Sequence, residues 1–291
     1  MTPIDNVQAT RALLYGWLAT RLEAAPLAWL DGQLDKISSG VRELDVAMAI
    51  GIAPRKLGKQ LLQLTSAEIA DARQLHRDFD ASHWSVDQAG RVALLLASFT
   101  GDDTAFAVLF EAVLRSGELN EHIALLQGLP LYPAPQALVG RAVEGLRTAM
   151  LPVFEAVAHR NPFPRDQFSE QQWNQMVLKA LFIESRLSPI VGLDERRNGD
   201  LAATLIDYAH ERWAAGRAVS PELWRCVGPF ARASDIPDLA KALSSSSDPE
   251  AKAAALALAE SDQPSAAATL GKAPALAAAI KAGTLTWTNF T

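Results

Sequence analysis

Apolar residues recur every three or four positions along most of the chain, and runs in which polar and apolar residues alternate are scarce. A repeat of three to four residues lines up apolar side chains on one face of an α-helix, whereas a half-buried strand needs a repeat of two. Alanine and leucine, both strong helix formers, are abundant. The pattern predicts an all-α protein made of roughly fifteen short helices.

Glycine and proline set the expected helix lengths between residues 85 and 150. Helix starts are expected near four positions in this stretch, namely Val86, Asp103, Leu119 and Gln136. A spacing of about sixteen or seventeen residues per helix is typical of stacked αα-hairpins. We therefore expect antiparallel helix pairs stacked into a HEAT-like α-solenoid or an irregular helical array.

Two helix starts carry side chains at the spacing of a capping box. Thr65 with Glu68, and Ser85 with Gln88, can each satisfy backbone donors at the start of a helix. The segment Thr104 to Leu114 is apolar nearly all round, which predicts a central helix buried between its neighbours.

The last sixty or so residues have a different composition. Ser244 to Ser247 form a polar hinge, and the sequence from Asp248 reads DPEAKAAALALAES, which is similar to the second helix of a HEAT-type repeat. Short Ala-rich helices bury little area each, so they must pack on preceding helices. We expect a main helical domain over residues 1–231 and, packed on it, Ala-rich HEAT-like helices and a docked, extended tail over residues 232–291.

Charge and cysteine content narrow the functional classes. The 291 residues include 33 acidic and 27 basic ones, a formal net charge of -6, which argues against sequence-independent nucleic-acid binding because phosphates require a basic face. The longest uncharged run, residues 123–140, is broken by three prolines, so no transmembrane segment is expected. With the lone Cys226 expected to be a buried hydrophobe and no secretory signal pattern, we expect a cytoplasmic protein.

Polar and aromatic residues concentrate between residues 161 and 230. This region contains the stretches WNQMVLKALF (173–182), GLDERRN (192–198), DYAHERWAAGR (207–217) and PELW (221–224). Within the first of them, an apolar helix face leaves Asn174 and Lys179 off its centre. These stretches resemble the EboA family, a bacterial family known chiefly from a gene cluster linked to metabolite traffic.

The resemblance implies a helical protein that acts with protein partners from the same gene cluster to move or process a small metabolite. It implies no catalytic residues and no cofactor.

Asp207, His210 and Glu211 stand at positions i, i+3 and i+4 of an expected helix, so they could share a face and supply metal ligands. No second histidine or cysteine accompanies them at a metal-binding spacing, and no serine or cysteine nucleophile accompanies His210. We therefore expect a solvated or salt-bridged face and no tightly bound transition metal. His76 and His83 are expected at the surface.

Four arginines lie close together in the sequence, and two roles are open for them. Arg196, Arg197, Arg212 and Arg217 could converge on a carboxylate or phosphate. Alternatively, they could pair with Asp194, Glu195, Asp200 and Asp207 to pin the loop. Trp173, Trp213 and Trp224 are more typical of core anchors than of ligand-stacking residues.

The density of hydrogen-bonding side chains predicts that residues 161–224 form the functional surface, because burying them is costly unless they meet each other or a ligand. The candidate binding residues are Asn174, Lys179, Asp194, Arg197, Asn198, His210, Glu211, Arg212, Trp213 and Arg217. Three functions stay open: a non-catalytic binding or adaptor protein, an enzyme with a cryptic polar site around Asn174–Trp224, and a purely structural assembly partner. Stacked helix pairs and the absence of catalytic spacing favour the first.

Overall fold

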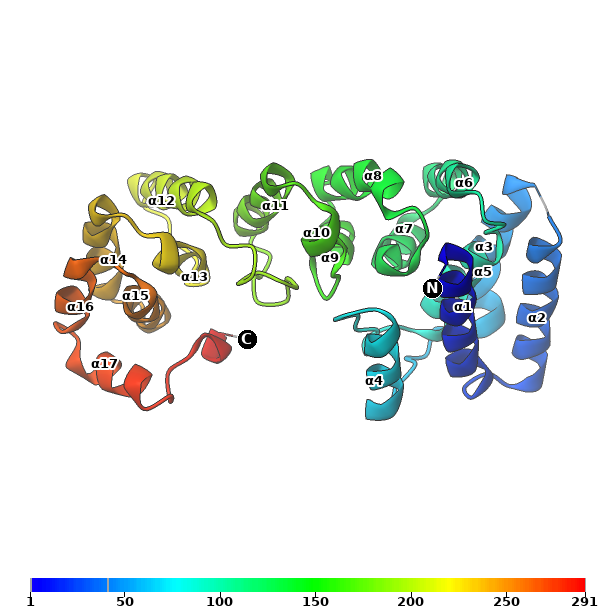
Figure 1. The fold of residues 1–291 in the computed structure, drawn as a ribbon, viewed down its shortest axis with the longest axis horizontal. Coiled ribbons are helices and arrows are strands. Elements are labelled where there is room, and N and C mark those ends of the chain that lie inside the picture. The colour runs from blue at the N-terminus through cyan, green and yellow to red at the C-terminus, as the bar shows by residue number, and fades with distance from the viewer. Residues whose placement is uncertain (1, 41, 291) are drawn as a thin grey trace. The chain divides into compact units, whose positions relative to one another are not determined.

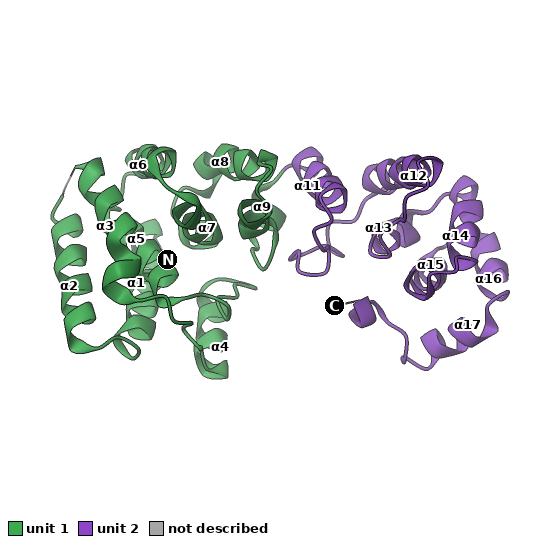
Figure 2. Ribbon diagram, turned by 180° about the vertical axis from the view of Figure 1, so that it is seen from behind, with its two compact units in different colours: residues 1–168 green, residues 169–291 purple. Residues whose placement is uncertain are grey.

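The computed structural model describes residues 2–40 and 42–290. That part of the chain contains seventeen α-helices, four 3₁₀ helices and no strand, which confirms the all-α class (Figure 1). An isolated antiparallel bridge joins Leu61 and Ser85. The chain divides into two compact units, Met1–Phe168 and Ser169–Thr291 (Figure 2). The boundary expected after residue 231 lies inside the second unit.

The first unit is built around one central helix, α5, which packs on α1, α2, α3 and α7. The later helices of this unit form the pairs α6–α7 and α8–α9 (Figure 1). The helices of the unit are α1 (Pro3–Ala19), α2 (Ala24–Ser38), α3 (Glu43–Leu57), α4 (Ser66–Leu75), α5 (Val86–Ala97), α6 (Asp103–Ser116), α7 (Leu119–Gln127), η1 (Leu129–Leu131), α8 (Pro135–Arg147), α9 (Leu151–Ala158) and α10 (Phe163–Gln167).

The sequence predicted where several of these helices begin. The three helices α5, α6 and α7 begin at the residues expected from the sequence, and α8 begins one residue earlier than expected, at Pro135. Both capping boxes, at Thr65 and at Ser85, are present. A helix start is a local event that needs only a cap and its neighbours, so the sequence is sufficient to predict it.

The prediction that residues 104–114 form the central buried helix was wrong. Helix α6 buries Phe106 and Phe110, but Val108 is 63% exposed, because one face of this helix has no neighbour within the unit. The fully surrounded helix is α5, and even its Arg91 is buried, with Asp87 at 3.2 Å and the Ile50 carbonyl accepting a hydrogen bond at 3.1 Å. Charge inside α5 is tolerated because it is paired.

The expectation of surface positions for His76 and His83 was also wrong. Both rings are half-buried, and burial lowers the pKa of His76 to about 4 and that of His83 below its ordinary value. The His76 ring lies 2.7 Å from the hydroxyl of Thr10. The physical reason is the neighbouring pair Phe79 and Trp84, each 1% exposed, which draws the connecting segment into the core.

The second unit is built around α15, which packs on α13, α14, α16 and α17. This is the Ala-rich helix expected from Asp248, and its alanines 253, 254, 255 and 257 are fully buried. The elements of the unit are α11 (Glu170–Phe182), α12 (Gly199–Ala214), α13 (Leu223–Val227), η2 (Gly228–Phe230), η3 (Ala233–Asp235), α14 (Ile236–Leu243), α15 (Asp248–Glu260), α16 (Pro264–Leu270), α17 (Pro274–Lys281) and η4 (Trp287–Phe290).

Two smaller expectations concern this unit. Cys226 is fully buried, as expected, and burial raises the pKa of its thiol to about 12. The tail docks on the unit as predicted, since Trp287 Nε1 donates a hydrogen bond to Glu260 at 2.6 Å, but it does so as a 3₁₀ turn rather than as an extended segment. Thr291 lies outside the described residues. None of the described helices has both the length and the apolar character needed to cross a membrane.

Candidate ligand-binding site

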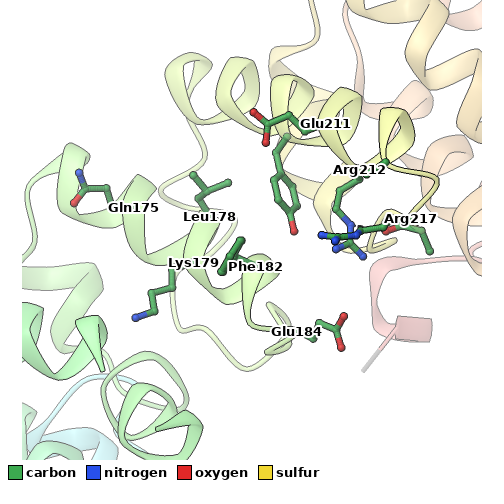
Figure 3. Close-up of a pocket in the computed structure, with 11 residues that line it drawn as sticks. Gln175, Leu178, Lys179, Phe182, Glu184, Glu211, Arg212 and Arg217 are labelled. Carbon is green, nitrogen blue, oxygen red and sulfur yellow. Dashed lines mark hydrogen bonds between the residues drawn. The ribbon is translucent and has the colours of Figure 1, made fainter. Parts of the chain in front are cut away.

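Helices α11 and α12 and the turns that follow them line an open cavity of about 960 Å³ in the second unit (Figure 3). This volume lies at the upper end of the range that is usual for small-molecule sites. The surface that the lining residues expose to the cavity is mainly apolar, although charged side chains also contribute; these residues are Gln175, Leu178, Lys179, Phe182, Glu184, Tyr208, Glu211, Arg212, Ala215, Arg217 and Ala218.

The helical repeat explains how α11 reaches the cavity. One face of this helix is buried and carries the core residues Trp173, Met176, Val177, Ala180 and Leu181. The residues at positions 175, 178, 179 and 182 follow a second stripe with the spacing i, i+3, i+4 and i+7, so they share another face. Phe182 stands at the end of this stripe and is 71% exposed.

Helix α12 contributes a matching stripe. Tyr208, Glu211, Arg212 and Ala215 repeat the spacing i, i+3, i+4 and i+7, while Leu201, Leu205 and their neighbours bury the opposite face. The Tyr208 hydroxyl donates a hydrogen bond to the Leu181 carbonyl at 3.4 Å. Two amphipathic helices of the same unit therefore place equivalent stripes on the cavity.

Helix α11 ends in a Schellman motif that places Glu184 at the cavity. The Ser185 N–H donates to the Ala180 carbonyl at 2.8 Å, and the Glu184 N–H donates to the Leu181 carbonyl at 3.3 Å. Glu184 has a φ of 59°, in the left-handed region that normally belongs to glycine. A glutamate here carries a conformational cost of about 1 kcal/mol.

Helix α12 ends in the same motif, and here glycine occupies the left-handed position. Gly216 has a φ of 65°, and its N–H donates to the Trp213 carbonyl at 3.0 Å. The Arg217 N–H donates to the Arg212 carbonyl at 2.8 Å. This cap folds the chain back by one turn, so Arg217 comes to lie beside Arg212.

The two arginines meet at one end of the cavity (Figure 3). The Arg212 Nε donates to the Ala218 carbonyl at 2.9 Å, which orients the guanidinium plane. Within the part of the chain that the structure describes, neither Arg212 nor Arg217 forms an ion pair with a carboxylate. In the view of Figure 3, Phe182 lies between Lys179 and the arginines; burial lowers the pKa of Lys179.

Asn174 and Asn198 lie elsewhere and bond to each other. The two side-chain amides exchange hydrogen bonds of 3.1 and 2.9 Å, and the Asn198 Oδ1 also accepts from the Leu201 N–H at 2.8 Å. Asn198 is thus the N-cap of α12. Neither side chain lines the cavity, and their arrangement joins α11 to the start of α12.

Asp194 and Arg197 belong to a network that holds the 191–198 loop. Asp194 receives two hydrogen bonds from Arg225, at 2.8 and 2.6 Å. Arg197 donates to the Arg225 carbonyl at 2.9 Å and to Glu260 at 2.8 Å, and it lies 3.6 Å from Asp194. We call this group, completed by Trp287 on Glu260, the loop network. Sequence reasoning missed Arg225 and Glu260 as its members.

His210 and Trp213 lie against α14. The His210 Nε2 is 2.9 Å from an Asp238 oxygen, and Lys241 Nζ lies 3.7 Å above the Trp213 ring. The expected common face of Asp207, His210 and Glu211 was therefore wrong in one respect: Glu211 lines the cavity while His210 pairs with α14. A rotation of about 100° between adjacent helical positions accounts for the split. No group of three potential metal ligands gathers among the described residues.

The expected convergence of the four arginines is found for two of them. Arg212 and Arg217 lie together at the cavity, Arg197 is in the loop network, and Arg196 lies over the ring of Trp173, 4.9 Å from its centroid. Trp173 and Trp224 are fully buried, as expected of core anchors, whereas Trp213 is half-buried.

A family model described as metabolite traffic protein EboA matches residues 10–228. The chain belongs to the EboA family. The match covers all the residues that line the cavity and ends before α14, so Glu260 and Trp287 of the loop network lie outside the EboA segment. No curated protein and no solved structure matches the chain.

Four of the ten candidate binding residues of this EboA-family chain line the cavity: Lys179, Glu211, Arg212 and Arg217. The other six are Asn174, Asp194, Arg197, Asn198, His210 and Trp213. Sequence reasoning missed Phe182, Tyr208 and Glu184. A signal for Phe182 exists, because it is an aromatic residue seven positions after Gln175, off the buried stripe of α11.

Proposed function

We propose that this EboA-family protein is a non-catalytic binding protein that holds a small metabolite in the cavity between α11 and α12. The observation that carries the proposal is the cavity itself, with Phe182 at 71% exposure on its wall. A large exposed aromatic side chain next to a concave, mainly apolar surface is typical of ligand sites. The family's description as metabolite traffic proteins supports the same role.

We assign ligand contact to Lys179, Glu211, Arg212 and Arg217, together with Phe182. Asn174, Asp194, Arg197 and Asn198 have partners inside the protein, which supports an architectural role for them. His210 and Trp213 stand on the α14 side of α12, where we propose no ligand contact.

The wider role is a proposal of the same kind. We propose that the protein passes its ligand to protein partners encoded in the same gene cluster, in the bacterial cytoplasm, without nucleic acid. We also propose HEAT-like stacking of the helix pairs; the packing of α6–α7 against α8–α9 supports it within the first unit.

Filling the cavity tests the ligand site. Purified protein is incubated with extract of the native cell, washed, and the small molecules released on denaturation are identified by mass spectrometry. Ala215→Trp places a bulky side chain in the cavity, whereas Ala214→Trp, on the same exposed end of α12 but outside the lining, is the matched control. Wild type and Ala214→Trp should release the same metabolite, and Ala215→Trp should release none.

The melting temperature decides how that result is interpreted. An Ala215→Trp variant with the wild-type melting temperature that still releases every small molecule would refute the cavity as the binding site. A pull-down from the same extract with Lys179→Ala and Arg217→Ala then tests the partners. If both variants stay folded and retain every partner and ligand, these side chains are architecture only.

A further inference from the structure

The charge around Arg212 and Arg217 limits what the cavity can hold. The chain has a formal net charge of -6, and elsewhere in the second unit Arg197, Arg225 and Arg232 each pair with a carboxylate. Arg212 and Arg217 stand side by side without such a partner among the described residues. Two adjacent guanidinium groups repel each other unless an anion lies between them, and their planar forks suit carboxylate or phosphate oxygens.

The backbone holds these two groups in place. The cap of α12 joins Arg217 to Arg212 through the 2.8 Å hydrogen bond between their main chains, and the Ala218 carbonyl orients the Arg212 guanidinium. Both side chains therefore start from fixed backbone positions, which reduces the entropy that a ligand must overcome on binding.

Next to the arginines the cavity wall is apolar. Phe182, Leu178, Ala215 and Ala218 provide carbon surface, and the Phe182 ring is the largest exposed element of it. An exposed ring at this position gains most from a flat apolar group stacked on it. The two remaining carboxylates come from different segments, Glu184 from the turn after α11 and Glu211 from α12, so a cation would meet one carboxylate and be repelled by the arginine pair.

We infer that the ligand is an organic anion: its carboxylate or phosphate is held by Arg212 and Arg217, and its flat apolar body rests on Phe182. The inference rests on the proposed function, since it names the chemical class of the metabolite bound in the same cavity. It also gives Glu184 a reason to occupy a left-handed position where glycine would avoid the steric strain: its carboxylate can accept a hydrogen bond from a hydroxyl or amino group on that body.

Two fluorescent probes that differ by one group test the inference. 8-Anilinonaphthalene-1-sulfonate is anionic, and N-phenyl-1-naphthylamine has the same rings without the sulfonate. With wild-type full-length protein, the anionic probe should bind at least about tenfold more tightly than the neutral one, because charge-assisted hydrogen bonds add to ring burial. Displacement by 1-naphthoate and by 1-naphthyl phosphate then distinguishes a carboxylate ligand from a phosphate ligand.

Three variants test which side chains are responsible for probe binding. Arg217→Ala should weaken the anionic probe by about tenfold and leave the neutral probe within about twofold. Phe182→Ala should weaken both probes. Arg55→Ala removes an exposed arginine near the end of α3, in the first unit, and is the matched control for loss of one positive charge; it should change neither.

The other possible results of the probe experiments each contradict either the anion inference or the proposed function. Equal binding of both probes, with Arg217→Ala unchanged and Phe182→Ala weakened, overturns the anion inference and leaves the cavity as a ligand site. Binding that Phe182→Ala and Ala215→Trp leave untouched overturns the proposed function as well. If the arginines serve only the carboxyl end of α12, Arg217→Ala will lower the melting temperature without altering the anionic probe, which also overturns the inference.

Discussion

Two pairs of arginines in the same stretch of this EboA-family chain lie in opposite surroundings. Arg197 and Arg225 have carboxylate partners, Glu260 at 2.8 Å and Asp194 at 2.6 Å, and their side chains are 17% and 18% exposed. Arg212 and Arg217 stand at the cavity without a carboxylate partner among the described residues. The same residue type thus holds a loop in one place and is available to a ligand in the other.

Residue type alone therefore does not separate an architectural arginine from one that can bind a ligand. A guanidinium that is largely removed from water, as in Arg197 and Arg225, must be compensated, and the loop network supplies that compensation from within the protein. At the cavity the compensation has to come from water or from a ligand. Substitutions in the two places should therefore affect different measurements.

The largest expected effect is on stability, in the loop network. Arg225→Ala should lower the free energy of unfolding by about 1–3 kcal/mol, because it removes two charge-assisted hydrogen bonds to Asp194 and leaves that carboxylate with only the more distant Arg197, at 3.6 Å. Arg217→Ala should lower it by less than about 0.5 kcal/mol. Urea unfolding at pH 7, followed by tryptophan fluorescence, measures both. Equal losses would remove the distinction between the two pairs.

The pH dependence of the Arg225→Ala loss sharpens the comparison. Burial raises the pKa of Asp194, but the hydrogen bonds from Arg225 and the charges of Arg225 and Arg197 outweigh it, so the pKa lies below the ordinary value of 3.8. A lowered pKa in the folded state means that the contribution is complete above pH 3.8 and is lost as the pH falls through the folded-state value.

Wild type and Arg225→Ala should therefore differ fully at pH 7 and converge as the pH falls below 3.8. The small difference between wild type and Arg217→Ala should not follow this course. Urea midpoints measured from pH 7 down to pH 3 check the point, and a constant gap for Arg225→Ala would show that Asp194 is not the group responsible.

A third effect concerns the two helix caps at the cavity. Gly216→Ala should destabilise the protein by about 1 kcal/mol, because alanine pays a steric cost at positive φ. Glu184→Gly should stabilise it by about 0.5 kcal/mol, since the cost of the left-handed glutamate outweighs the extra freedom of glycine in the unfolded chain. Thermal unfolding of both variants measures the shifts, and changes of the same sign would contradict this account.

The smallest expected effect is at the α14 side of α12. His210→Ala removes a pair with Asp238 in which the histidine side chain is 51% exposed, so stability should fall by less than about 0.5 kcal/mol. Binding of the anionic probe should not change. A loss of probe binding with unchanged stability would return His210 to the ligand site, as the sequence hypothesis had it.

The helices of this protein follow from the amino-acid sequence, because apolar periodicity and capping act within a few residues. The sequence determined the starts of α5, α6 and α7, the buried stripe of α11 and the burial of Cys226. Its motifs also pointed to the EboA family. These features depend on the local chain or on single residues, so reading along the sequence is sufficient.

Which polar side chains pair and which stay available to a ligand depends on packing between distant segments of the chain. Arg197 forms an ion pair with Glu260, which lies 63 residues further along the chain, and nothing in the sequence near Arg197 predicts that partner. The same limit explains why α5 rather than the apolar α6 is surrounded, and why Phe182 remains exposed although it is aromatic. Periodicity reveals that a helix has an apolar face, but the number of neighbours that cover it, and therefore the free energy of each contact, is set by packing between distant segments.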